Sequence, residues 1–298
     1  MHSSAPSAAT LDERADLRTD VHTGARTYVV ASRQERPNLP AAECPFCPGG
    51  LEALDPYDVR WFTNRWPAMP DGRCEVILYA PEHDATLWSL GAQRARKVID
   101  LWAERTAELG ARPDVSYVLV FENRGSEVGA TIAHPHGQIY AFDFVPDVPR
   151  RELERGDLFA EPGERLVAEA PGWRAWVPEA SIFPYALVLV PDAPVPDLPA
   201  LDDAGRDGFA HLLVDVLERL DCRFATRTPY MLWIHQRPFD GGDWPFARLH
   251  VELVSPWRAP NVPRFIAAGE LGSGVYFNPV APEAAAEALR RAPIGAAS

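Results

Sequence analysis

The sequence has no apolar run approaching the length of a membrane span, which needs about 20 consecutive apolar residues. Its first ten residues also lack the basic and apolar regions of a secretory signal peptide. Only four cysteines occur among 298 residues, which suits a reducing compartment better than a disulfide scaffold. We therefore expect a cytoplasmic protein that does not enter a membrane.

Basic residues are also scarce, with 29 lysines and arginines against 42 acidic residues and a formal net charge of -13. This balance argues against a partner that is a nucleic acid or an anionic membrane. An anionic substrate would have to be met by a local cluster of arginines, because the overall field repels it. With 47% hydrophobic residues, the chain can still bury a large core.

Hydrophobic periodicity predicts an α+β chain of many strands and a few helices. Strands are expected near residues 27–32, 74–80, 115–122, 138–144, 173–177, 185–190, 229–235 and 248–254. Helices are expected near residues 90–109, 202–220 and 281–291. The pattern indicates two αβ halves, residues 1–155 and 156–298, and the segment 248–253 of the second half occupies the strand comparable to the histidine motif of the first.

That motif is His134-Pro135-His136-Gly137-Gln138, which lies between two extended, apolar stretches. On a strand, side chains two residues apart share a face. A neutral imidazole held by a hydrogen bond at its other ring nitrogen is a good nucleophile toward phosphorus. The motif therefore predicts a covalent nucleotidyl-histidine intermediate.

A Cys-x-x-Cys pair, Cys44 and Cys47, precedes Gly49-Gly50 and can turn two thiolates onto one metal ion. Tetrahedral zinc is coordinated by four ligands, and the candidates for the third and fourth ligands are His83 and His134. The alternative is a redox pair or a disulfide. We favour zinc, because the Pro- and Gly-rich surroundings do not offer the βαβ context of a thioredoxin-like motif.

Several separated segments, in the same order, make the chain resemble the galactose-1-phosphate uridylyltransferases of the histidine-triad superfamily. The matching segments are residues 18–37, the Cys44/Cys47 pair, residues 62–67, 81–83, 121–125 and 128–131, and the histidine motif. The resemblance implies two histidine-triad-like halves with antiparallel sheets and flanking helices. It also implies ping-pong transfer of UMP from UDP-glucose to galactose 1-phosphate, and a homodimer with active sites at the subunit interface.

The same resemblance implies roles for individual residues. His136 would be the nucleophile, assisted by Gln138, and zinc would be held by Cys44, Cys47, His83 and His134. Substrate would be bound by Arg33, Arg36, Asn64, Trp66, Asn123, Gly129 and Thr131, with the sugar segment Arg264, Phe265 and Glu270.

A second metal, iron or another zinc, is implied at Glu152, His235, His250 and Glu252. Some members of the family carry His-x-His where this chain has His250-Val251-Glu252, so the last ligand would be a carboxylate, which is harder than an imidazole. The alternative is that Glu252 is a surface residue beside a partly buried His250.

Gln138 separates transfer from hydrolysis, because nucleotide hydrolases of the wider superfamily have a third histidine at this position. A neutral amide can hydrogen-bond a phosphate oxygen but cannot donate a proton as imidazolium does. The residue therefore favours a transferase. The alternatives are a related nucleotidyl-sugar phosphorylase or adenylyltransferase, a hydrolase, and a zinc-stabilised binding protein that has lost catalysis.

Overall fold

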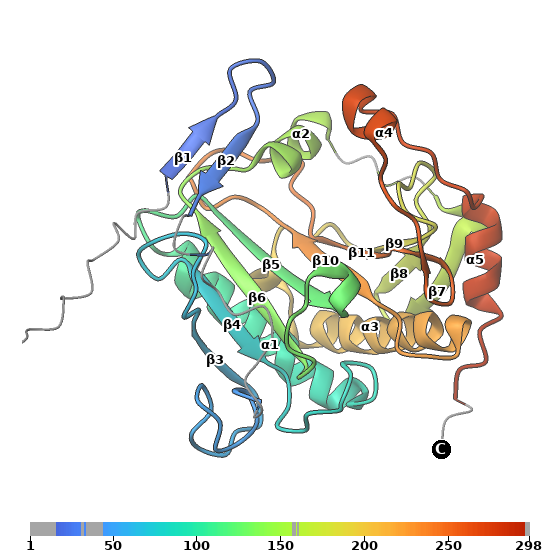
Figure 1. Ribbon diagram of the computed structural model, residues 1–298, viewed down its shortest axis with the longest axis horizontal. Helices are drawn as coiled ribbons and strands as arrows, with labels where there is room; N and C mark the ends of the chain where they lie inside the picture. The colour runs from blue at the N-terminus through green and yellow to red at the C-terminus, as the bar shows by residue number, and fades with distance from the viewer. Residues whose placement is uncertain (1–15, 31–32, 34–43, 157–158, 160, 296–298) are drawn as a thin grey trace, which may run out of the picture.

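The computed structural model describes residues 16–30, 33, 44–156, 159 and 161–295. Its centre is a nine-stranded sheet in the order β3-β4-β6-β5-β10-β11-β9-β8-β7, with every neighbouring pair antiparallel (Figure 1). The strands are β3 (Arg60–Thr63), β4 (Cys74–Leu78), β5 (Tyr117–Arg124), β6 (His136–Phe142), β7 (Leu166–Ala170), β8 (Trp173–Trp176), β9 (Tyr185–Pro191), β10 (Tyr230–His235) and β11 (His250–Ser255). The expected α+β class is confirmed.

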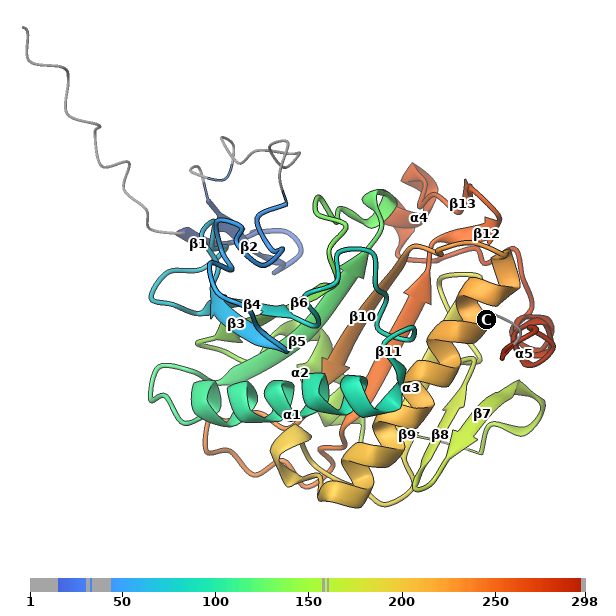
Figure 2. The ribbon, with the colours of Figure 1, turned by 90° about the horizontal axis from the view of Figure 1, so that it is seen from below.

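Two long helices, α1 (Gly91–Gly110) and α3 (Asp203–Phe224), lie across one face of this sheet (Figure 2). Each buries an apolar stripe against the strands, as Trp102 on α1 and Phe209 on α3 illustrate. The Asp202 side chain caps α3 by accepting a hydrogen bond from the Gly205 N–H at 2.7 Å. The helices leave the other face of the sheet open for side chains that carry chemistry.

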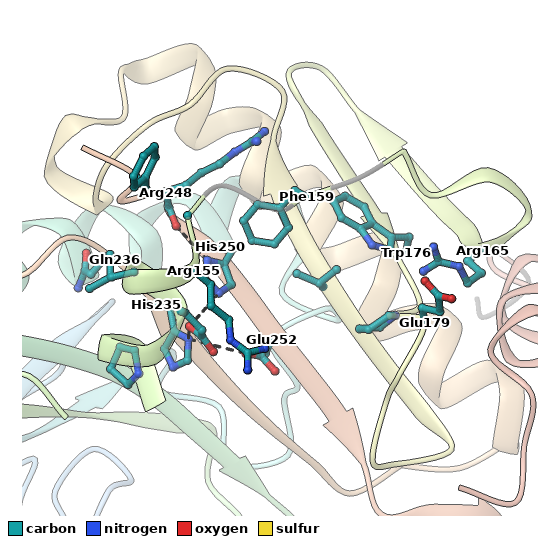
Figure 3. Close-up of a pocket in the computed structure, with 17 residues that line it drawn as sticks. Arg155, Phe159, Arg165, Trp176, Glu179, His235, Gln236, Arg248, His250 and Glu252 are labelled. Carbon is teal, nitrogen blue, oxygen red and sulfur yellow. Dashed lines mark hydrogen bonds and ion pairs between the residues drawn. The ribbon is translucent and has the colours of Figure 1, made fainter. Parts of the chain in front are cut away.

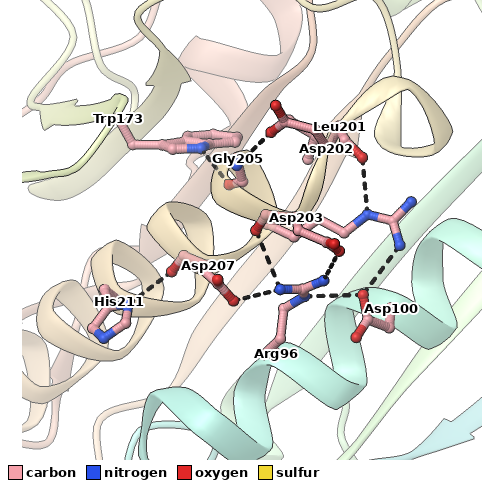
Figure 4. A network of polar contacts seen from close by, with 10 residues as sticks. Arg96, Asp100, Trp173, Leu201, Asp202, Asp203, Gly205, Asp207 and His211 are labelled. Carbon is pink, nitrogen blue, oxygen red and sulfur yellow. Dashed lines mark hydrogen bonds and ion pairs between the residues drawn. The ribbon is translucent and has the colours of Figure 1, made fainter.

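Polar contacts join the two helices at the middle of the sheet (Figure 4). Arg96 of α1 donates to Asp100 on its own helix at 3.0 Å and to Asp203 of α3 at 2.7 Å. It also donates to Asp207, one turn further along α3. The guanidinium thus ties the start of one helix to the start of the other.

The remaining elements surround the sheet. They are the hairpin of β1 (Asp16–Thr19) and β2 (Arg26–Val29), the helix α2 (Asp147–Arg155), the pair β12 (Trp257–Ala259) and β13 (Val262–Pro263), and the helices α4 (Ala268–Ser273) and α5 (Pro282–Arg290). Short 3-10 turns at residues 126–128, 163–165 and 198–200 complete the assignment. Among the described residues, no helix is both long enough and apolar enough to cross a bilayer.

Every strand and helix expected from periodicity overlaps an observed one, although residues 31–32 of the first expected strand lie outside the described part. Periodicity did not predict β1, β3, β7, β12, β13, α2 or α4. Most of these are too short to complete a recognisable period. The boundary between residues 155 and 156 stays a prediction, since both sets of strands belong to one sheet.

Candidate active site and metal clusters

A cavity of about 710 Å³ lies on the open face of the sheet, over β6, β5 and the end of β3. It brings together most of the residues expected to meet nucleotide and phosphate. These are Arg33, Asn64, Trp66, Asn123, Gly129, Thr131, His136 and Gln138. The alternation of β6 explains the arrangement, because His136 and Gln138 face the cavity while Ile139 and Ala141 belong to the core under the helices.

His136 stands at the first position of β6 with a defined orientation. Its Nδ1 lies 2.7 Å from the backbone oxygen of His134. A carbonyl oxygen only accepts, so Nδ1 carries the proton and Nε2 keeps its lone pair. The Phe46 ring packs against the imidazole at an interplanar angle of 64°, with centroids 5.1 Å apart. The ring is therefore fixed at the wall of the cavity, with Nε2 as the nitrogen that a neutral imidazole would use as a nucleophile.

A short relay of hydrogen bonds orients the Gln138 amide. The backbone N–H of Trp66 donates to Asn64 Oδ1 at 2.9 Å, so the other end of that side chain is the Nδ2 donor. This Nδ2 donates to Gln138 Oε1 at 3.3 Å. The relay leaves the Gln138 NH2 group as a donor for an oxygen in the cavity, two residues along the strand from His136.

The opposite face of β5 and β6 carries a buried acid that sequence reasoning did not assign. Phe121 and Asn123 line the cavity, but Glu122 between them points into the core and accepts a hydrogen bond from the Tyr230 hydroxyl at 2.6 Å. Burial raises the pKa of Glu122 to about 7, opposed by the Tyr230 hydroxyl and the Arg124 charge. The carboxyl lies on the core side of β5, the strand that pairs with β6.

The first metal cluster consists of Cys44, Cys47, His83 and His134, whose ligand atoms all lie within 4.8 Å of one another. Cys47 Sγ lies 3.5 Å from His83 Nδ1 and 3.6 Å from His134 Nδ1. In tetrahedral zinc with Zn–S about 2.3 Å and Zn–N about 2.05 Å, sulfur and nitrogen ligands stand about 3.6 Å apart. The donor set and its spacing therefore fit a zinc ion.

The residues behind this cluster fix the histidine that it shares with the motif. His134 Nε2 lies 2.7 Å from the Ala80 backbone oxygen and 2.8 Å from the Tyr57 hydroxyl, which itself donates to the Phe46 backbone oxygen at 2.7 Å. The Ala80 carbonyl requires Nε2 to carry the proton, so Nδ1 is available as a ligand. Burial lowers the pKa of His134, which keeps the ring neutral.

Sequence reasoning assigned no role to Tyr57 or to two aromatic residues that line the cavity, Phe46 and Phe62. Tyr57 is separated from His134 by 77 residues, and no local pattern links them. Phe46 lies between the two cysteines of the Cys-x-x-Cys pair, directly before Cys47. Its position beside the metal cluster could therefore have been predicted from that motif.

The second cluster joins Glu152 of α2, His235 of β10, and His250 and Glu252 of β11, again with ligand atoms within 4.8 Å (Figure 3). Glu152 Oε2 lies 2.6 Å from His235 Nδ1 and 3.7 Å from His250 Nε2. Burial lowers the pKa of His250 to about 4, so its ring is neutral. Two imidazoles and two carboxyl groups are a donor set for a divalent transition metal.

The expected sugar segment does not line the cavity. Arg264 forms a buried ion pair with Glu270, whose carboxylate also accepts hydrogen bonds from the backbone N–H groups of Ala267 and Phe277 at 2.8 and 2.9 Å. The Phe265 side chain is 79% exposed. Arg36 lies outside the described residues.

Comparisons with known proteins agree over most of the chain. Residues 58–146 match the family model of the galactose-1-phosphate uridyl transferase N-terminal domain, and residues 132–294 match that of the C-terminal domain. The chain is 34% identical to galactose-1-phosphate uridylyltransferase of Thermotoga maritima over 92% of this chain and 98% of that protein. It is 38% identical to the enzyme of the same name from Streptomyces lividans, over 84% of this chain and 79% of that protein.

Solved structures show the same fold. A uridylyltransferase superimposes with a TM-score of 0.83 at 26% identity, covering 93% of this chain and 97% of its own. An ADP-glucose phosphorylase from Arabidopsis thaliana superimposes with a TM-score of 0.77 at 21% identity, covering 94% and 99%.

The fold and the histidine-lined cavity place the chain among the histidine-triad-like uridylyltransferases. Within that class, the chain belongs to the galactose-1-phosphate uridylyltransferase family.

Proposed function

We propose that this enzyme transfers a uridylyl group from UDP-glucose to galactose 1-phosphate, releasing glucose 1-phosphate and then UDP-galactose. Family membership supports the reaction. The observation that carries the mechanism is the hydrogen bond of 2.7 Å from His136 Nδ1 to the His134 carbonyl oxygen, which leaves a nucleophilic Nε2 at the cavity.

In the first half-reaction His136 Nε2 attacks the α-phosphorus of UDP-glucose. An N–P bond forms, the bond from that phosphorus to the bridging oxygen breaks, and the oxygen leaves with its electron pair as part of glucose 1-phosphate. In the second half-reaction a phosphate oxygen of galactose 1-phosphate attacks the same phosphorus and restores the imidazole. A sugar phosphate is an anion that leaves without being protonated, so no general acid is required.

The remaining groups at the cavity bind and orient the transferred phosphoryl group. Phosphoryl transfer needs donors directed at the equatorial oxygens. We assign this task to the oriented Gln138 NH2 group, to Asn123 and Thr131, and to the Arg33 charge, with Asn64 and Trp66 near the nucleoside. Arg36 is assigned on sequence alone. Gly129 has a φ of 83°, which favours glycine and lets the backbone approach the phosphates.

We assign zinc to Cys44, Cys47, His83 and His134, where it would act as a structural ion that anchors the start of the nucleophile strand. Iron or a second zinc would be held by Glu152, His235, His250 and Glu252, which suit a transition metal of intermediate hardness. Neither ion is given a chemical step.

We further propose a cytoplasmic homodimer in which the segment around Phe265 reaches the cavity of the partner copy. An exposed apolar patch on this segment supports the dimer. Its members are Phe265, Ile266, Leu271, Val275, Tyr276 and Phe277. Mixing His136→Ala chains with Glu270→Ala chains should restore activity if sites are shared, and no recovery after subunit exchange would refute sharing. The four cysteines are free of disulfides, in keeping with a reducing compartment.

The decisive experiment incubates the full chain with UDP-glucose alone and measures its intact mass. We expect an increase equal to one uridylyl group per chain, with release of one glucose 1-phosphate. A chain that turns over substrate without the adduct would contradict the covalent mechanism. ADP-glucose in a parallel reaction separates the enzyme from a phosphorylase, and free UMP released as fast as transfer would indicate a hydrolase.

A further inference from the structure

The sheet has an approximate two-fold axis between β5 and β10, which relates eight of its nine strands and leaves the edge strand β7 without a counterpart. Reading outward from this pair, β6, β4 and β3 on one side match β11, β9 and β8 on the other, with antiparallel pairing throughout. The helices α1 and α3 are related in the same way and cover the same face (Figure 2). The open face should therefore present two equivalent positions.

His250 occupies the position of the nucleophile in this comparison. It is the first residue of β11, as His136 is the first residue of β6. Its Nδ1 lies 2.9 Å from the backbone oxygen two residues earlier, the same hydrogen bond that orients His136. A phenylalanine packs at a similar angle against each ring, Phe46 at 64° with centroids 5.1 Å apart and Phe159 at 62° with centroids 4.9 Å apart.

The equivalence extends to the row of paired strand residues that lies beneath each cavity, which we call its floor. Strand pairing links residues 62, 76, 138 and 121 on one side and residues 176, 188, 252 and 233 on the other. The resulting pairs are Phe62 with Trp176, Val76 with Val188, Gln138 with Glu252, and Phe121 with Trp233. The second half thus keeps an aromatic floor beside its histidine.

A cavity of about 390 Å³ lies over this second floor (Figure 3), within the usual size range of small-ligand sites. It differs from the first cavity in charge. Glu252 replaces the neutral Gln138, and Glu152 lies 3.7 Å from His250 Nε2, so two carboxyl groups beside this ring oppose an approaching phosphate. With its Nε2 in the metal cluster, His250 is assigned as a ligand and not as a second nucleophile.

The charges around the second cavity define the ligand it would take. Its lining holds three arginines, at 155, 165 and 248, and three glutamates, at 152, 179 and 252, which cancel. A divalent ion on the second cluster would leave two positive charges, matched by the dianion of a phosphate monoester.

The rest of the lining favours a flat, apolar group beside that phosphate. Trp176, Phe159 and Phe246 contribute aromatic surface. The amide of Gln236 is occupied, since its Oε1 accepts from the Leu198 N–H at 3.1 Å and its Nε2 donates to the Val118 carbonyl oxygen at 3.0 Å. A sugar with many hydroxyls would find few partners here, whereas an aromatic ring can stack.

We propose that the second cavity is a binding site for a phosphate monoester that carries an aromatic ring, such as a nucleoside monophosphate, and that it binds only when the Glu152, His235, His250 and Glu252 cluster holds a divalent metal. The site binds this ligand without transferring it. The proposal is independent of which nucleotide sugar the first cavity uses.

The test measures AMP binding to the full chain by equilibrium dialysis, with metal content determined by mass spectrometry. With both clusters loaded, we expect one AMP site more than in a Glu152→Gln, Glu252→Gln double variant that has lost the second metal and retains the first. Ribose 5-phosphate, which has the same sugar and phosphate without the base, should bind the additional site at least about tenfold more weakly. Equal AMP stoichiometry in the two proteins, or equal binding of ribose 5-phosphate, would overturn the proposal.

Matched variants in the two floors test whether the additional AMP site is the second cavity. Trp176→Leu should weaken the additional AMP site about tenfold while two metal ions remain bound, and Phe62→Leu should leave that site intact. If Trp176→Leu does not fold, Arg165→Gln provides the same comparison through charge. An additional site that both second-cavity variants leave unchanged would place AMP elsewhere and refute the assignment.

Discussion

At the start of β6 the ring of His136 is followed by Gly137 and Gln138, whereas at the start of β11 the ring of His250 is followed by Val251 and Glu252. Both rings are held by the same backbone hydrogen bond. The difference in chemistry therefore comes from charge around the ring, because an amide accommodates phosphate oxygens and a carboxylate attracts a cation. Four substitutions test this comparison.

The largest effect should come from removing the nucleophile. We expect His136→Ala to lower the rate of uridylyl transfer by at least about 10⁴-fold, because it removes the imidazole that forms the covalent intermediate. Intact mass after incubation with UDP-glucose should show no adduct. The His250→Gln chain should lose the second metal yet still accept a uridylyl group at His136. An adduct that survives in His136→Ala would break the comparison.

Exchanging the charge should be the next most damaging change. Gln138→Glu places in the first cavity the carboxylate that the second cavity has at this position. We expect a decrease of about 10²–10³-fold in kcat/KM, because the carboxylate repels the phosphate oxygens and cannot donate a hydrogen bond. Gln138→Asn, which keeps a neutral amide, is the control and should be less affected. Steady-state kinetics of both variants decide the point, and equal losses would show that length matters and charge does not.

The chemically reactive residues of this comparison could be predicted from the sequence, but the contacts that orient them could not. His136, Gln138 and the Cys-x-x-Cys pair are recognisable because each belongs to a short motif of residues that are close in the sequence. The residues that orient them come from distant segments, as Tyr57 beside His134 and Asn64 beside Gln138 show. Strand pairing decides such contacts, and a single sequence does not specify pairing between distant strands.

The alternation of side chains along β5 also explains why Glu122 does not face the cavity, although its sequence neighbours do. The segment Phe121-Glu122-Asn123 reads as a single motif, yet its middle residue faces the core. Short edge strands such as β3 were missed for a related reason, since four residues give too few alternations to predict. The helices and central strands were long enough to be predicted, and they fix the frame on which both clusters lie.

A third difference concerns the core behind the two strands. In the two-fold comparison, Glu122 of β5 is equivalent to Ile234 of β10. The residues that follow them, Asn123 and His235, are equivalent in the same way. Burial raises the pKa of Glu122 from 4.5 to about 7. Between these values the unfolded chain binds fewer protons than the folded one, so the free energy of unfolding falls as pH rises from about 4.5 to 7 and is level above that.

This contribution amounts to a loss on the order of 3 kcal/mol across that interval, at 1.36 kcal/mol per pKa unit. Glu122→Gln should remove it, because an amide does not titrate and can still accept from the Tyr230 hydroxyl. Urea unfolding at pH 5 and pH 7 checks the prediction. Wild type should lose more stability over this range than the variant, and parallel pH profiles would rule out a titrating Glu122.

The smallest effect should come from Gly137, whose equivalent in β11 is the β-branched Val251. A Cβ on Gly137 would lie 2.1 Å from the Tyr79 hydroxyl oxygen and 3.1 Å from the Phe121 backbone oxygen. Tyr79 is fully buried, and its equivalent on β9 is Pro191, which has no such reach. We expect Gly137→Ala to cost about 2 kcal/mol of unfolding free energy through overpacking.

Tyr79→Phe supplies the matched control, because it removes the closest atom and leaves the ring in place. In a double-mutant cycle measured by urea unfolding, Gly137→Ala should be less costly in the Tyr79→Phe background than in wild type. If the two costs are equal, the hydroxyl is not the group that excludes a side chain, and the Phe121 backbone becomes the limiting contact. In either case β6 tolerates less at its second position than β11 does, because the Tyr79 hydroxyl or the Phe121 backbone oxygen fills the space that a side chain would need, whereas β11 carries Val251 there.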